Sequence, residues 1–150
     1  MKRIWSIILL VSALAITSTT TSYAQCKNFA KGVCKPQLEP YIHDGIYNAT
    51  ELSEGESAEL FKTFYSGQEY RVAICGDPTL PPIEFQILDA DRNILFSNKE
   101  ANFAKVWDFK LEASQQLIIS IQVGMNEDKA SDQTARGCVA VLIGFLNTDK

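Results

Sequence analysis

Four cysteines are the residues with the most specific chemistry in this sequence of 150 residues. Cys26, Cys34, Cys75 and Cys138 are widely spaced, without the Cys-x-x-Cys pair that is typical of structural zinc sites. An even number of cysteines in an exported chain is typical of disulfides, so the sequence predicts two disulfides rather than a zinc site. Three pairings are possible. We prefer Cys26–Cys34, which closes a tight N-terminal loop, and Cys75–Cys138, which joins two neighbouring strands if their Cα atoms lie within about 7 Å.

His43, the sole histidine, is followed by Asp44, and such a pair can orient a general base. A nucleophile would have to lie beside it, but the cysteines are expected to be oxidised and no Gly-x-Ser-x-Gly motif presents a serine. An acidic run at residues 51–59 has no spacing that defines a pair of catalytic carboxylates. We therefore interpret His43 as a loop residue, assign no catalytic residue and expect no enzyme activity.

Oxygen-bearing side chains recur at Asp89, Asp91 and Asn93, and Glu100 follows at the twelfth place counted from Asp89. This spacing is similar to that of an EF-hand calcium loop. The sixth place is Ile94, however, where the sharp turn of such a loop needs glycine, and strands rather than helices are expected on both sides. We interpret the segment as a plain hairpin. The four oxygen-bearing residues are a weak calcium candidate, and we expect no cofactor.

Three aromatic residues are candidates for stacking against a sugar ring. Trp107 alternates with Phe109 along an expected strand, which favours a core position over a glycan contact. Tyr41 and Tyr47 lie before the main run of strands and are the better candidates for exposed rings, although no motif supports them.

The N-terminus has the three parts of a secretory signal peptide. Two basic residues precede an apolar run at residues 4–16, and Ser22 and Ala24 provide the small side chains that signal peptidase requires. The apolar run is shorter than the roughly 20 residues that span a bilayer. We predict cleavage after Ala24, and no stable membrane insertion of the mature chain.

A lipid anchor on Cys26 is not favoured, because Gln25 stands where a lipoprotein signal needs a small residue. We therefore expect a periplasmic or extracellular protein. Removal of residues 1–24 leaves 126 residues with 12 basic and 18 acidic side chains, a formal charge of −6. Nucleic acids and anionic membranes attract basic patches, so this balance argues against both as partners.

The mature chain reads as one domain, with an irregular, disulfide-pinned arm at residues 25–40 followed by an all-β domain at residues 41–150. Apolar residues alternate with polar ones in most of the expected strands, which predicts a two-sheet antiparallel sandwich of jelly-roll type. Residues 57–65 (SAELFKTFY) fit either a short helix or a strand, and we favour the strand. The other expected strands are residues 69–75, 83–88, 93–97, 103–111, 116–123 and 138–146.

Several of these segments occur in an order that resembles the pre-peptidase C-terminal domain, a small bacterial β-sandwich. The resemblance lies in residues 67–72 (GQEYRV), residues 85–95 (FQILDADRNIL) and the last two strands at residues 117–123 and 139–145. Arg92 departs from it, since such turns often carry glycine. The resemblance implies a non-catalytic accessory or binding module and no active-site residue. The mature chain also resembles many short exported proteins of Gram-negative bacteria.

The sequence thus favours a non-enzymatic module of the cell envelope, or a secreted one, that binds a protein or a glycan. The alternative is a small hydrolase, or an inhibitor of a hydrolase, that uses loop carboxylates. A deep cleft that holds His43 with two carboxylates would favour catalysis. One patch of exposed aromatic rings would favour a glycan.

Overall fold

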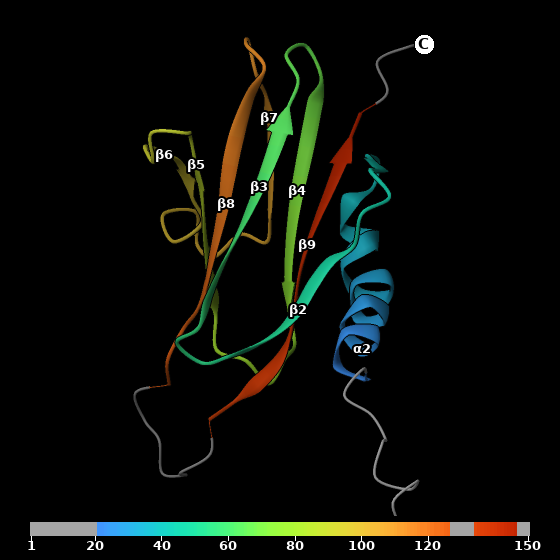
Figure 1. Cartoon of the computed structure of the whole chain (residues 1–150), viewed down its shortest axis with the longest axis vertical. Coiled ribbons are helices and arrows are strands. Elements are labelled where there is room, and N and C mark those ends of the chain that lie inside the picture. Colours follow the sequence, from blue (N-terminus) through green and yellow to red (C-terminus); the bar gives the residue numbers. More distant parts are fainter. Residues whose placement is uncertain (1–20, 127–133, 147–150) are drawn as a thin grey trace, which may run out of the picture.

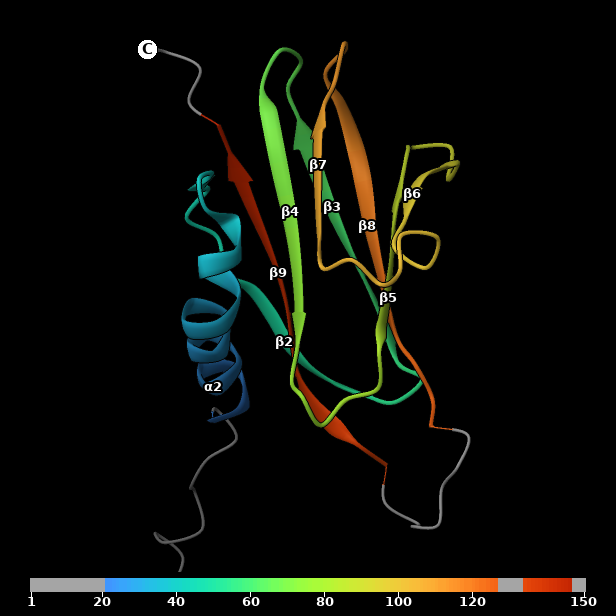
Figure 2. The ribbon, with the colours of Figure 1, turned by 180° about the vertical axis from the view of Figure 1, so that it is seen from behind.

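The computed structural model describes residues 21–126 and 134–146, and it contains two antiparallel sheets that face each other (Figures 1 and 2). In one sheet, β9 (Arg136–Phe145) pairs with β1 (Ile42–His43), β2 (Asn48–Ser53) and β4 (Glu69–Gly76), and β7 (Val106–Lys110) pairs with β4. The second sheet has the order β3 (Ser57–Phe64), β8 (Gln115–Val123), β5 (Ile83–Leu88) and β6 (Ile94–Ser97). The predicted all-β sandwich is confirmed.

The core lies between the two sheets, where the alternating apolar residues of both meet. Val72 and Ile74 of β4 point into it, and their neighbours in β9 are Ile143 and Val141. The second sheet contributes a comparable set from its inner face: Phe64, Phe85, Ile87, Leu117, Ile119, Ile121 and Val123. These side chains are at most 4% exposed, so period-two alternation decides which face of each strand is buried.

Residues 57–64 form the strand β3 and not a helix, as the favoured interpretation predicted. Phe61 points to solvent and is 52% exposed, whereas Phe64 is fully buried. Residues 103–105 lie outside β7, which is shorter than predicted. Two short strands, β1 and β2, were not predicted; they extend the sheet beside β9.

The N-terminal arm is helical, which corrects the prediction of an irregular segment. An α-helix, α2 (Thr21–Phe29), continues into one turn of π-helix (Ala30–Cys34) and one of 3-10 helix (Lys35–Leu38). The arm packs on the outer face of the sheet that contains β9 (Figures 1 and 2). Its buried residues recur every fourth position, at Cys26, Ala30, Cys34 and Leu38. The sheet meets them with small side chains, among them Ala73 and Ala140, which allow a close approach.

The predicted disulfide pairing is wrong. The bonds are Cys26–Cys138, with Cα atoms 5.1 Å apart, and Cys34–Cys75, with Cα atoms 5.6 Å apart. Cys26 and Cys34 are eight residues apart in a helical segment, about 12 Å along its axis. In the sheet, Cys75 lies opposite Ala140, so Cys138 is its diagonal neighbour at about 7–8 Å. Each strand cysteine therefore bonds to the arm. The arm is pinned by disulfides as predicted, but to two different strands.

Candidate functional site

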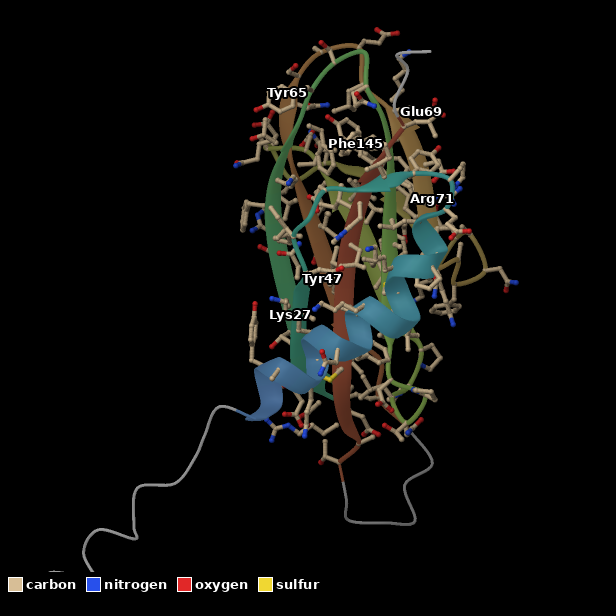
Figure 3. All side chains as sticks on the ribbon, turned by 90° about the vertical axis from the view of Figure 1, so that its right-hand side faces the viewer. Lys27, Tyr47, Tyr65, Glu69, Arg71 and Phe145 are labelled. Atoms are coloured by element: carbon tan, nitrogen blue, oxygen red, sulfur yellow. A yellow bond between two sulfur atoms is a disulfide. The ribbon has the colours of Figure 1, made fainter. Side chains whose placement is uncertain are left out.

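One end of the sandwich carries two turns that lie side by side, the β3–β4 turn at residues 65–68 and the β7–β8 loop at residues 111–114 (Figures 1 and 2). We call these two segments the tip. Tyr65 stands at its edge (Figure 3) and is 65% exposed, more than Phe61 at 52% or Phe103 at 42%. A large aromatic side chain exposed on a turn is a common anchor in protein interfaces.

Hydrogen bonds hold the tip in one shape. The Ser66 amide donates to Ser114 Oγ at 2.9 Å, and the Gly67 amide donates to the Leu111 carbonyl at 3.1 Å, so the two segments are joined. The Tyr70 hydroxyl accepts from the Tyr65 amide at 3.1 Å. Gly67 has a φ of 80°, a left-handed conformation that glycine adopts without steric cost. The tip is therefore preorganised, so that less conformational entropy is lost when a partner binds.

One face of the Tyr41 ring is covered by a cation. The Arg71 guanidinium lies 4.6 Å from the centroid of the Tyr41 ring, and it also forms two hydrogen bonds of 2.7 Å with Asp108. Partial burial of the Tyr41 hydroxyl, together with the nearby carboxylates of Asp108 and Glu69, raises the pKa of Tyr41. Figure 3 shows Arg71 and Glu69 on the side of the molecule that carries the helical arm. The ring is part of a structural charge cluster.

Tyr47 is covered in the same way. The ammonium groups of Lys27 and Lys31, both from the helical arm, lie 6.0 and 5.5 Å from its ring centroid, and the His43 ring is tilted against it at 4.5 Å. Cations at this distance are attracted to the ring quadrupole. Tyr47 thus fastens the arm to the start of β2 (Figure 3), and a sugar ring would have to displace these contacts.

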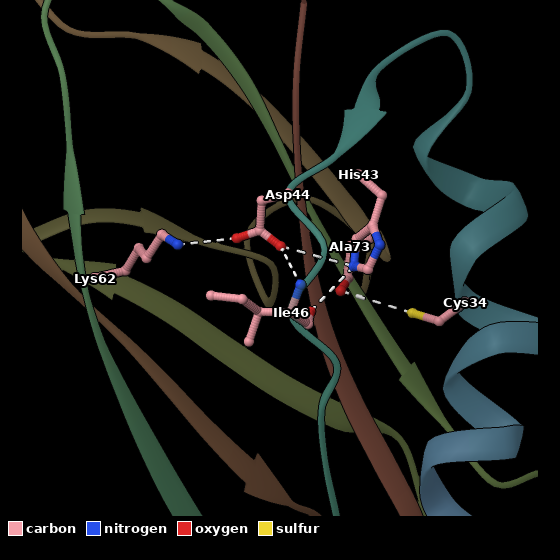
Figure 4. A network of polar contacts seen from close by, with 6 residues as sticks. All are labelled: Cys34, His43, Asp44, Ile46, Lys62 and Ala73. Carbon is pink, nitrogen blue, oxygen red and sulfur yellow. Dashed lines mark hydrogen bonds and ion pairs between the residues drawn. The ribbon is translucent and has the colours of Figure 1, made fainter.

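His43 is the last residue of β1, paired with Gly144, and not the loop residue that the sequence predicted; Asp44 follows it directly (Figure 4). His43 Nε2 is 3.0 Å from the Ile46 carbonyl oxygen and 3.7 Å from Asp44 Oδ1. Asp44 Oδ1 accepts from the Ile46 amide at 2.9 Å, and Asp44 Oδ2 accepts from Lys62 Nζ at 2.9 Å. The last contact ties β3 to the segment between β1 and β2 and so links the two sheets. Cys34 appears in the same view, but its sulfur is bonded to Cys75 and carries no proton to donate.

Trp107 lies in a stack of aromatic rings at the sheet edge. Its ring is 5.0 Å from Phe96 and 4.3 Å from Phe109, nearly parallel to both. Phe109 in turn contacts Phe64 and Tyr70. Trp107 packs against the core, so the geometry supports the core interpretation of this residue over the glycan one.

The weak calcium candidate is a tight hairpin turn. Asp89 Oδ1 accepts from the amides of Asp91 and Asn93, and Asp89 Oδ2 accepts from the Asn93 side chain. These bonds lower the pKa of Asp89, the side-chain bond from Asn93 most. Glu100 lies beyond β6, in the next turn. Arg92, where glycine is common, has a left-handed φ of 65°. Within the described ranges, no group of three or more His, Cys, Asp or Glu side chains is placed to hold a metal ion.

The role of Tyr65 and its supports was not predicted from the sequence. Ser114, the partner of the β3–β4 turn, lies 48 residues from Ser66 in sequence. The helical arm that brings Lys27 and Lys31 to Tyr47 was not predicted either. The buried stripe at every fourth residue of the arm was the available signal.

Comparisons with known proteins give little more than a distant likeness. No protein-family model and no curated protein sequence matches the chain. Among solved structures, the chain is similar to PliG from Aeromonas hydrophila, a periplasmic inhibitor of g-type lysozyme. The identity is 12%, the alignment covers 72% of this chain and 90% of that one, and the TM-score is 0.49. These values are too low to assign a function.

Proposed function

We propose that the protein is a non-enzymatic, exported binding module whose tip inserts into a concave site of a protein partner. The observation that carries this proposal is the tip itself, a convex and hydrogen-bonded pair of turns with Tyr65 65% exposed at its edge. A rigid convex element fits a cleft, and the clefts of enzymes are their active sites. The module therefore acts as an inhibitor of a hydrolase of the envelope or the extracellular space.

A protein partner fits this geometry better than a glycan. The three aromatic residues that the sequence offered for sugar stacking are committed to partners within the chain, namely Arg71, Lys27 with Lys31, and the rings beside Trp107. Tyr65 has a largely open side chain, and it is the only aromatic residue of the two tip segments, so the tip itself carries no row of rings.

Export is consistent with the disulfides. The two disulfides together use all four cysteines of the chain, and disulfides persist in oxidising compartments. The sulfur of Cys26, which a lipid anchor would need, is bonded to Cys138. No helix in residues 21–126 and 134–146 is long and apolar enough to cross a membrane.

Site-specific photo-crosslinking tests the proposal. A benzoylphenylalanine residue replaces Tyr65 in one variant and Phe61 in a control. Phe61 is 52% exposed on β3, four residues before Tyr65 and outside the tip. Each tagged protein is irradiated in its native envelope extract, and the adduct is identified by mass spectrometry. We expect a single protein adduct at position 65 and none at position 61.

Binding and inhibition are then measured with the purified partner. Replacement of an interface hot-spot residue costs about 2 kcal/mol or more, so Tyr65→Ala is expected to raise the dissociation constant roughly 30-fold, and Phe61→Ala to raise it less than about threefold. Stoichiometric loss of the partner's hydrolytic turnover is expected with the unmodified module only. A panel of glycan hydrolases, including lysozymes, extends this assay. Crosslinks at position 61 alone, an adduct with glycan only, or turnover by the module itself would each overturn the proposal.

A further inference from the structure

A pocket of about 290 Å³ opens at the end of the sandwich opposite the tip. It lies where β4 ends, where β5 begins and where the β6–β7 connection returns at residues 98–105. Ile74 and Phe85, both at most 3% exposed, form part of its lining and connect it to the core. Leu80, Ile83 and Phe103 add apolar surface. A water takes up about 30 Å³ in the liquid, so the pocket has room for roughly ten water-sized groups.

A buried amide holds the pocket open in a fixed shape. Asn98 is 2% exposed and lines the pocket, and its Oδ1 accepts from the Phe85 amide at 2.8 Å. Its Nδ2 donates to the carbonyls of Ile83 at 3.0 Å and Ala104 at 3.3 Å. These bonds join the first residues of β5 to the β6–β7 connection. The two walls are therefore tied together without any ligand, as in most small-molecule sites.

The β6–β7 connection, which supplies Phe103 to the pocket lining, has an unusual backbone. Asn102 and Phe103 are consecutive non-glycine residues in the left-handed region, with φ of 52° and 55°. A left-handed aromatic residue is a steric outlier, and such residues concentrate at ligand-binding positions. The Phe103 amide donates to the Asn98 carbonyl at 2.8 Å, which keeps the strained turn in place. The ring of Phe103 is thereby held at the pocket with 42% of its surface exposed.

Two charged residues line the pocket, and only the cation lacks a partner. Asp77 Oδ1 accepts from the amide and the hydroxyl of Thr79, at 2.9 and 2.7 Å. Lys105 is exposed, and within the described chain its ammonium group has no hydrogen bond or ion pair. The Lys105 carbonyl accepts from the Ile74 amide at 2.8 Å, so the backbone beneath this lysine is fixed to β4. The pocket thus combines an apolar interior with a positive charge that has no partner in residues 21–126 and 134–146.

We propose that this pocket binds a small molecule with an apolar chain and a carboxylate head, which is the chemistry of a short-chain fatty acid. The chain fills the space between Ile74, Phe85 and Phe103, and the carboxylate pairs with Lys105. A saturated acid of eight carbons has ten non-hydrogen atoms, which fits the available volume. This site is separate from the tip and does not depend on the function proposed for it.

The probes are octanoate, octan-1-ol and octylammonium, which share one chain and differ in the head group. Binding to the mature protein is measured by titration of its ¹H–¹⁵N spectrum. Octanoate is expected to bind with a dissociation constant of roughly 0.1–1 mM, which is ordinary for a ligand of this size, and more tightly than the other two. The amides of Ile74, Ile83 and Lys105 are expected to shift most, which locates the ligand without any variant.

Two pairs of variants separate the contributions of ring and charge. Phe103→Gly removes the ring but suits the left-handed backbone, so the protein is expected to stay folded and to bind octanoate at least tenfold more weakly. Asn102→Gly relaxes the residue next to Phe103 and keeps the ring. The dissociation constant of this variant for octanoate is expected to lie within about twofold of that of the parent. Lys105→Met is expected to weaken octanoate about fivefold and to leave octan-1-ol unchanged. Lys110→Met makes the same charge change on β7 and is expected to have no effect.

Several results would overturn the proposal. The site does not exist if none of the three probes binds at concentrations up to the solubility limit of octan-1-ol, or if the largest amide shifts lie elsewhere. The ring has no role if Phe103→Gly binds octanoate as the parent does. Preference for octylammonium over octanoate would assign the head-group contact to Asp77 and contradict the carboxylate ligand.

Discussion

The pairing of the disulfides can be decided by removing the two cysteines of the arm. In the variant Cys26→Ala/Cys34→Ala, both bonds of the structure lose one partner, and Cys75 and Cys138 are left as thiols. These two cysteines are diagonal neighbours in the sheet, at about 7–8 Å between Cα atoms, which is too far for a bond without backbone movement. We expect two free thiols per chain. If Cys26 were joined to Cys34 instead, the same variant would keep the Cys75–Cys138 bond and would contain no free thiol.

The loss of stability also has a calculable size. The Cys34–Cys75 bond joins residues 41 apart in sequence, and the Cys26–Cys138 bond joins residues 112 apart. The chain entropy that such loops remove from the unfolded state corresponds to about 4 and about 5 kcal/mol. Replacement of Cys34 and Cys75 together is expected to lower the free energy of unfolding by about 4 kcal/mol. For a mature chain of this length, that is a decrease of roughly 15 °C in Tm.

Thiol titration in denaturant and urea unfolding of the mature variants are the two assays. The parent, with no free thiols, is the control for the first assay and the stability reference for the second. The reasoning is refuted if Cys26→Ala/Cys34→Ala contains no reactive thiol. It is also refuted if Cys34→Ala/Cys75→Ala loses less than about 1 kcal/mol, because the arm would then not be anchored by a bond that closes a long loop.

The core, the Asn98 amide and the two aspartate turns can each be tested by stability measurements. Phe64→Ala is expected to cost about 3–5 kcal/mol in urea unfolding and Phe61→Ala less than about 1 kcal/mol, since the first ring is fully buried and the second is 52% exposed; equal costs would contradict the strand β3. Asn98→Ala leaves one buried and two partly buried backbone groups without this partner and is expected to cost about 3 kcal/mol, and a neutral result would show that water replaces the amide. Hydrogen bonds within their own turns lower the pKa of Asp77 and Asp89 below the ordinary 3.8. The stability that these bonds supply is therefore present above pH 3.8, and it is lost as the pH falls through the pKa values of the folded state. Tm measured from pH 6 to pH 2 should therefore decrease below about pH 4, and a Tm that rises in this range would contradict the assignment.

The strands could be predicted because apolar and polar residues alternate along most of them with a period of two. Leu117, Ile119 and Ile121 are apolar at alternate positions because one face of β8 lies in the core. The helical arm gives a weaker signal in the sequence, since its buried stripe consists largely of cysteine and alanine. A disulfide framework and small-residue packing account for such residues equally well, so they do not by themselves indicate a helix. The stripe has a period of four residues, in keeping with the wider π-helical turn at Ala30–Cys34.

The candidate sites could not be predicted, because they depend on contacts between distant segments. The exposure of Tyr65 follows from the meeting of two turns, through a bond between residues 66 and 114. The pocket depends on Asn98, whose amide joins two segments that no local pattern relates. The surroundings of the three rings proposed for glycan stacking could not be predicted for a similar reason. Nothing in the sequence around Tyr41 shows that Arg71, 30 residues later, covers its ring.

The two candidate sites lie at opposite ends of β4, and this separation makes a final prediction possible. The tip adjoins Glu69 and the pocket adjoins Gly76, seven residues later, so about 23 Å of strand lies between them. Changes this far apart without shared partners are additive within about 0.5 kcal/mol, a factor of about two in affinity. The double variant Tyr65→Ala/Phe103→Gly should therefore bind the partner protein as Tyr65→Ala does and octanoate as Phe103→Gly does. If saturation with octanoate changed the affinity for the partner more than fivefold, the two ends would be coupled through the sandwich, and a rigid β4 with independent sites would have to be abandoned.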